Sequence, residues 1–158
     1  MRLPLAFALA LTACSGSGSS TPAETELEAA RTKFEQSSSS GSYTFHSRRS
    51  CECTTEATRE MFITVENGAI TSAIYVDNEM PVPQNLRDSL FTIESAFEEI
   101  QTAIDENAHM IYVEYDASLG YPASIAIDYS AQIADEELSL IISNVEPLLQ
   151  TCGVRPCG

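Results

Sequence analysis

The stretch MFITVENGAITSAIYV, residues 61–76, places two runs rich in β-branched and aromatic residues on either side of Asn67-Gly68. Asn-Gly is typical of a two-residue turn with positive φ at both central residues, whose twist matches that of the paired strands. A β-hairpin is therefore predicted. Counting outward from the turn puts mostly apolar pairs on one face: Val65 with Ile70, Ile63 with Ser72, and Met61 with Ile74. Thr64 and Thr71 then share the other face.

Two segments outside this hairpin have the spacing of helices. Thr21 and Glu24 form a capping-box pair around Pro22, so a helix is predicted from Pro22 to about Gln36. Further along, apolar residues recur at intervals of four, three and four: Ile93, Phe97, Ile100 and Ile104. With Thr92 as N-cap and Asn107 as stop, this pattern predicts the main, amphipathic helix of the domain.

Alternating side chains predict further strands at 43–47, 109–115 and 125–129. Residues 138–145 are apolar and β-branched and favour a last strand, although a helix after the acidic run 135–137 stays open. Strands clustered around one main helix indicate an α+β domain over residues 23–147. We expect a single antiparallel sheet of about five to six strands, with the main helix and the N-terminal helix packed on it.

The N-terminus predicts export. Residues 1–13 have the layout of a signal peptide, with Arg2, an apolar run too short to cross a bilayer, and small residues at its end. The tetrad Leu11-Thr12-Ala13-Cys14 resembles a lipobox, in which the cysteine is acylated. Residues 14–22 then form the lipidated Cys14 and a flexible Gly/Ser tether. The alternative is an ordinary signal peptide with a chance cysteine.

The lipobox interpretation predicts a protein exported and lipid-anchored to a bacterial membrane. In a Gram-negative host, Ser15 after the cysteine favours the outer membrane, facing the periplasm. The charge balance limits the partners, because 23 acidic against 8 basic residues give a net charge of −15. Such a surface repels nucleic acid and anionic lipid headgroups, so no nucleic-acid partner is expected. The simplest role of the acidic residues is solubility.

Besides Cys14, the chain contains four cysteines: Cys51, Cys53, Cys152 and Cys157. An even number in an exported domain favours two disulfides. They either staple the C-terminal tail, residues 148–158, to the end of the first strand, or each pair closes locally. Two functional alternatives stay open. Cys51 and Cys53 could form a strained, exchange-active disulfide, or the four thiolates could hold zinc, although their spacing is unlike a zinc knuckle.

No catalytic signature and no cofactor or metal-ligand set is predicted. His46 and His109 lie on separate predicted strands, where a hydrogen-bonded or solvated role is expected. A candidate binding loop has aromatic and turn-forming residues: Tyr115, Asp116, Gly120, Tyr121 and Pro122. The alternative is that these tyrosines pack the rim of the sheet and that Asp116 caps a turn.

Several ordered segments resemble one family of bacterial lipoproteins, the domain-of-unknown-function 6174 family. They run from Ala30-Arg31 through Ser42-Tyr43-Thr44-Phe45 and Arg49-Ser50-Cys51-Glu52-Cys53, over the hairpin around Asn67-Gly68, to Leu119-Gly120-Tyr121-Pro122, Ile125-Ala126-Ile127-Asp128-Tyr129 and Ile133-Ala134-Asp135-Glu136-Glu137. The resemblance implies one domain at an exported location. It implies no activity, because none is established for the family.

The leading hypothesis is a membrane-tethered lipoprotein domain of the cell envelope. It is not an enzyme, and it either binds an envelope protein or a small ligand or serves structurally. The alternative is a thiol-based redox or metal-binding protein that works through Cys51 and Cys53.

Overall fold

The computed structural model describes residues 20–51, 54–132, 137–148, 151–152 and 155–156, the last two pairs by their backbone alone. In chain order the elements are α1 (Pro22–Ser37), β1 (Tyr43–Arg49), α2 (Thr55–Thr58), β2 (Met61–Glu66), β3 (Ala69–Tyr75), α3 (Gln84–Arg87), α4 (Ile93–Asp105), β4 (Met110–Tyr115), β5 (Pro122–Asp128), β6 (Glu137–Pro147), β7 (Thr151–Cys152) and β8 (Arg155–Pro156). The predicted signal peptide, Cys14 and most of the predicted tether lie outside the described residues.

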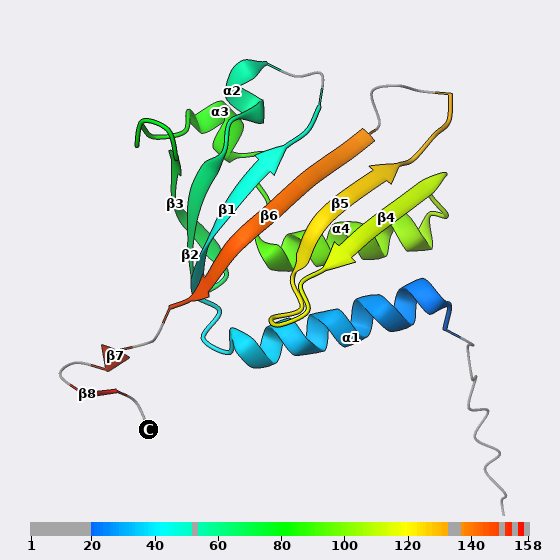
Figure 1. Cartoon of the computed structure of the whole chain (residues 1–158), viewed down its shortest axis with the longest axis horizontal. Coiled ribbons are helices and arrows are strands. Elements are labelled where there is room, and N and C mark those ends of the chain that lie inside the picture. Colours follow the sequence, from blue (N-terminus) through cyan, green and yellow to red (C-terminus); the bar gives the residue numbers. More distant parts are fainter. Residues whose placement is uncertain (1–19, 52–53, 133–136, 149–150, 153–154, 157–158) are drawn as a thin grey trace, which may run out of the picture.

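The main sheet has six strands in the order β3-β2-β1-β6-β5-β4. Every neighbouring pair is antiparallel. This confirms the predicted α+β fold with one antiparallel sheet. The last segment, which the sequence left open between strand and helix, is the long strand β6 near the middle of the sheet (Figure 1). Leu140 and Ile142 of β6 are buried, and alternation rather than helical spacing suits that position.

The hairpin forms as predicted, but most of its predicted register is wrong. Asn67 and Gly68 have φ of 53° and 76°, and Val65 pairs with Ile70. Beyond that pair the register shifts by one residue, so Thr64 faces Ser72 and Ile63 faces Ala73. The extra residue, Thr71, forms a β-bulge in β3. Beyond a bulge, the side chains of the strand that would have faced solvent face the core instead, and the other set faces solvent. As a result Ala73 and Tyr75 are buried, whereas the predicted pairing would have buried Ser72 and Ile74.

Both long helices begin at caps that the sequence specifies. Thr21 accepts from the Glu24 N–H, with Pro22 in the first turn of α1, and Thr92 accepts from the Ser95 N–H at the start of α4. The helix α1 packs against α4, which in turn packs on β4 and β5 (Figure 1). In β1 and β2 the side chains that point toward these helices are buried, whereas in β4 they are half-buried, and the side chains on the opposite, open face are half-buried or exposed. Hydrophobic side chains are therefore buried on one face of the sheet.

Tyr43 joins the sheet to the start of α4. Its side chain is fully buried, and its hydroxyl accepts a 2.9 Å hydrogen bond from the Ile93 N–H while donating to the Glu94 carboxylate. Burial and the neighbouring Glu94 raise the pKa of Tyr43 far above its usual value. The Phe34 ring of α1 meets the Tyr43 ring edge-on, with centroids 5.4 Å apart. One side chain thus contacts both helices.

Gly120 and Gly68 give a matched test of how closely the β4–β5 loop approaches α1. Both have positive φ, but a Cβ on Gly120 would lie 2.5 Å from the Ala30 carbonyl oxygen, whereas one on Gly68 would meet nothing within 4 Å. We expect Gly68→Ala to lower the free energy of unfolding by about 1 kcal/mol, through backbone strain alone. Gly120→Ala adds overpacking and should lower it by roughly 3 kcal/mol. Urea denaturation measures both, and equal losses would contradict the close packing of this loop on α1.

Candidate functional site

A small cavity lies at the end of the sheet where β1 finishes and β2 begins. Its volume is about 50 Å³, enough for a few water molecules or a small polar group with part of an apolar chain. The lining comes from β1, α2, β2, α3, the segment after α3, and β6: Ser47, Arg49, Ala57, Met61, Leu86, Ser89, Leu90, Phe91 and Leu140. Most of these side chains are apolar, so the cavity suits a ligand with an apolar part.

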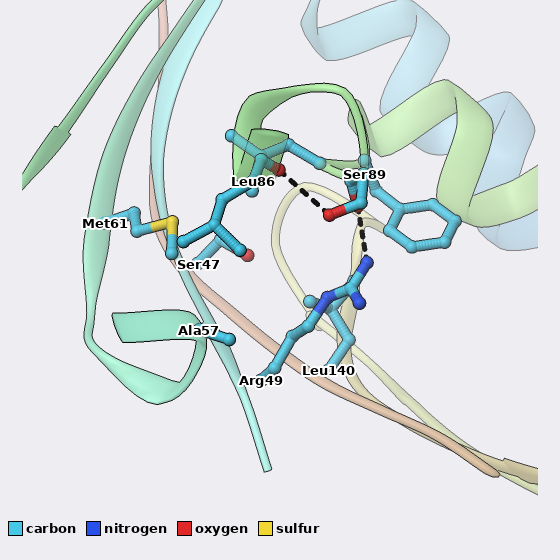
Figure 2. Close-up of a pocket in the computed structure, with 9 residues that line it drawn as sticks. Ser47, Arg49, Ala57, Met61, Leu86, Ser89 and Leu140 are labelled. Atoms are coloured by element: carbon cyan, nitrogen blue, oxygen red, sulfur yellow. Dashed lines mark hydrogen bonds between the residues drawn. The ribbon is translucent and has the colours of Figure 1, made fainter. Parts of the chain in front are cut away.

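Arg49 is the charged member of this lining. Its guanidinium donates to the Ser89 carbonyl oxygen, as Figure 2 shows, and lies 5.6 Å from the centroid of the Phe91 ring. The side chain is half-buried, and this burial lowers the pKa of Arg49. Among the described residues, ion pairs join His46 to Glu60 and Arg59 to Asp77, and none includes Arg49. A half-buried cation therefore lines the cavity without a carboxylate from the described chain.

The segment 83–91 holds the far wall of the cavity. Pro83 precedes the short helix α3, and its carbonyl accepts from the N–H groups of Leu86 and Arg87. The Ser89 hydroxyl then donates to the Leu86 carbonyl at 2.9 Å, which fixes the turn that carries the Ser89 carbonyl toward Arg49 (Figure 2). The helix α3 was missed because a single turn has no periodic pattern to detect.

The predicted cysteine sites are only partly described. Cys51 lies two residues beyond Arg49 and is disulfide-bonded. Cys53 lies outside the described residues, as do the side chains of Cys152 and Cys157. The C-terminal tail leaves β6 at Pro147, which pairs with Tyr43, whereas Cys51 follows the opposite end of β1, where Arg49 pairs with Leu140. The tail thus begins at the end of the sheet remote from Cys51.

The predicted binding loop makes packing and turn-forming contacts. Asp116 Oδ1 accepts from the N–H groups of Ser118 and Leu119 at 2.9 and 2.7 Å, and the Gly120 N–H donates to the Asp116 carbonyl. Tyr121 is only 8 % exposed, and Pro122 is buried.

Tyr115 is half-buried and stacks on Phe97 at 6.3 Å between ring centroids. Burial is the main cause that raises the pKa of Tyr115 to about 12. The loop residues described here therefore have structural roles, in packing or in forming the turn. Whether the loop also binds a partner stays a prediction.

The two histidines do not meet. His46 lies on the open face of the sheet, where its Nδ1 is 2.9 Å from Glu60 Oε1 and its ring meets Phe62 edge-on at 5.6 Å. His109 lies just before β4, on the other half of the sheet. Within the described part of the chain, no cluster of three or more histidine, cysteine or acidic side chains has a geometry that could hold a metal ion.

In the sequence, Arg49 stood out only as part of a segment that resembles the family. What singles it out is that no carboxylate of the described residues pairs with it, and this becomes visible only in three dimensions.

In the described residues, no helix has the length and apolar character needed to span a membrane.

Residues 26–147 match a family described as a family of unknown function, DUF6174. This range takes in most of α1, the whole six-stranded sheet and the Arg49 cavity. No curated protein matches the chain. No solved structure matches it either.

Proposed function

The chain belongs to the DUF6174 family, whose function is unknown, and from that premise we propose that it is a lipid-anchored binding domain of the bacterial cell envelope. In this proposal the domain catalyses no reaction. Its ligand is a small molecule or a side chain that presents a carboxylate to Arg49 and a short apolar group to the rest of the cavity.

The half-buried Arg49, which pairs with no carboxylate of the described residues, is the observation that carries the proposal. A guanidinium presents parallel N–H donors that match the two oxygens of a carboxylate, and such charge-assisted bonds are among the strongest in proteins. A buried cation without a counter-ion is unfavourable, so an entering carboxylate relieves that cost. Arg49 is already held by the Ser89 carbonyl and the Phe91 ring, so little of its freedom is lost on binding.

The lining narrows the ligand class. No second cation lines the described part of the cavity, which favours a singly charged carboxylate over a phosphate. Leu86, Leu90 and Phe91 offer apolar surface to a short aliphatic or aromatic group. The hydroxyl of Ser89 is engaged with the Leu86 carbonyl rather than with a base, which supports binding rather than nucleophilic chemistry.

The tether supports the envelope location. Cys14 and the Gly/Ser run precede α1, which starts at Pro22. A flexible linker of this length spans on average roughly 16 Å, so the proposed anchor holds the domain close to a membrane surface. The net charge of −15 repels anionic headgroups and keeps the domain from lying flat on that surface.

The carboxylate proposal predicts a specific pattern of binding. Propionate and butyrate should bind in the millimolar range and shift the amide NMR signals of residues around the cavity, whereas propanol and butanol should bind at least tenfold more weakly. Arg49→Gln should weaken carboxylate binding at least tenfold, since a charge-assisted hydrogen bond contributes about 1.5–3 kcal/mol. Arg48→Gln is the matched control, because Arg48 is the exposed neighbour on the same strand. Equal binding by Arg49→Gln and Arg48→Gln would overturn the site.

The anchor is tested separately in a bacterial host supplied with labelled palmitate. The full chain should incorporate the label and sediment with membranes, and Cys14→Ser should lose both properties. Cys51→Ser is the control and should keep the label. If Cys14→Ser still fractionates with membranes and carries lipid, the lipobox interpretation is wrong.

The second candidate function is thiol chemistry. The observation that supports it is the disulfide at Cys51, two residues from Arg49. Intact mass and disulfide mapping of the chain from Ser15, exported to an oxidising compartment, decide between the two. We expect all four cysteines in stable bridges and no metal. A labile bridge at Cys51 and Cys53, or bound zinc, would instead support redox or metal-binding chemistry at that pair.

A further inference from the structure

The two edges of the six-stranded sheet differ. At the outer edge of β3, the segment 80–82 supplies backbone partners: Tyr75 N–H donates to the Met80 carbonyl and Val82 N–H to the Ala73 carbonyl, both at 3.0 Å. Pro81 also forms a bridge with Ile74. At the other edge, β4 pairs with β5 alone. Within the described part of the chain, no other segment pairs with the outer side of β4 (Figure 1).

The strand β4 has only one of the features that usually protect an edge. Proteins block edges with proline, charged side chains (lysine above all), very short strands or a covering segment. The sequence of β4 is MIYVEY, six residues with no proline, no lysine and one charge, Glu114. The strand is therefore long enough and apolar enough to accept another strand.

Side chains on both faces of β4 would meet an added strand. Met110 and Tyr112 are 49 % and 51 % exposed and share the open face of the sheet. Ile111, Val113 and Tyr115 are half-buried on the face that the helices cover. Cross-strand pairs with such apolar and aromatic side chains stabilise sheets by up to about 1 kcal/mol each.

Acidic side chains flank this edge and indicate the chemistry of the partner. Glu114 lies exposed on the open face, where it accepts from the Tyr112 hydroxyl. On the other face lies Glu26 of α1, whose negative charge adds to burial in raising the pKa of Tyr115. Because each copy of the chain carries a net charge of −15, two copies repel each other. The edge therefore fits a basic partner better than a second copy.

We propose that the free edge of β4 binds an extended, basic segment of another polypeptide, which adds to the sheet as a seventh strand. Backbone hydrogen bonds along β4 would provide affinity, and basic side chains opposite Glu114 and Glu26 would provide selectivity. This site is separate from Arg49, which lies at the end of β1, because the strands β6 and β5 lie between β1 and β4 in the sheet.

The probe is a fluorescein-labelled peptide of sequence KVTVKVTV, titrated into the exported chain carrying Cys14→Ser and followed by anisotropy. One control peptide has N-methyl groups on alternate residues, which removes the hydrogen-bond donors of one edge. A second control replaces lysine with glutamate. We expect binding of the first peptide and at least tenfold weaker binding of both controls. Hydrogen exchange should slow at residues 110–115 and stay unchanged around Arg49.

Two exposed substitutions test the edge itself. Glu114→Lys and Tyr112→Lys should each weaken the peptide at least fivefold, whereas Glu66→Lys, the same charge change at the turn-side end of β2, should have less than a twofold effect. Equal binding of the N-methylated peptide, protection outside residues 110–115, or self-association of the protein through β4 would each overturn the proposal.

Discussion

The hydroxyl of Tyr43 is the contact on which the arrangement of this domain depends. The start of an α-helix leaves backbone N–H groups without partners, and burying such a start in an apolar core is costly unless a side chain satisfies them. Tyr43 does so from the first strand, by accepting from the Ile93 N–H and donating to Glu94. Because its ring also contacts Phe34 and Phe45, the same residue sets α4 on the sheet and gives α1 its place beside α4. The cavity at Arg49 and the free edge of β4 lie on opposite sides of this fixed frame.

Much of this frame could be predicted from short-range patterns. The Asn67-Gly68 turn, the Thr21 and Thr92 caps and the alternation in β1 are local signals, and the structure confirms each of them. The hairpin register was not predictable in the same way. Two sets of alternate residues, one containing Ile74 and one containing Tyr75, are both apolar enough to face a core. Only the packing of the whole domain selects Tyr75, and the bulge at Thr71 follows from that choice.

The candidate site illustrates a different limit. Its lining residues run from Ser47 to Leu140 and come from three separate stretches of the chain, residues 47–61, residues 86–91 and Leu140. An arginine at the end of a strand is ordinary, because most arginines are solvated or paired. What distinguishes Arg49 is that it is half-buried without a carboxylate partner among the described residues, which is a property of the folded domain. The free edge of β4 was equally hidden, since the strand order depends on where β6 inserts.

The position of β6 also has a consequence for how the chain reaches this fold. Strands β1–β3 form one half of the sheet and β4–β5 the other, and β6 is the strand that joins them, although it is the last of the six to be made. Until Pro147 has left the ribosome, the two half-sheets have no shared neighbour and the core cannot close. Such late-closing, non-local topologies fold slowly. For a chain exported as proposed here, that delay is useful. A polypeptide that cannot close its sheet early stays unfolded enough to pass through a narrow channel until β6 has emerged on the far side.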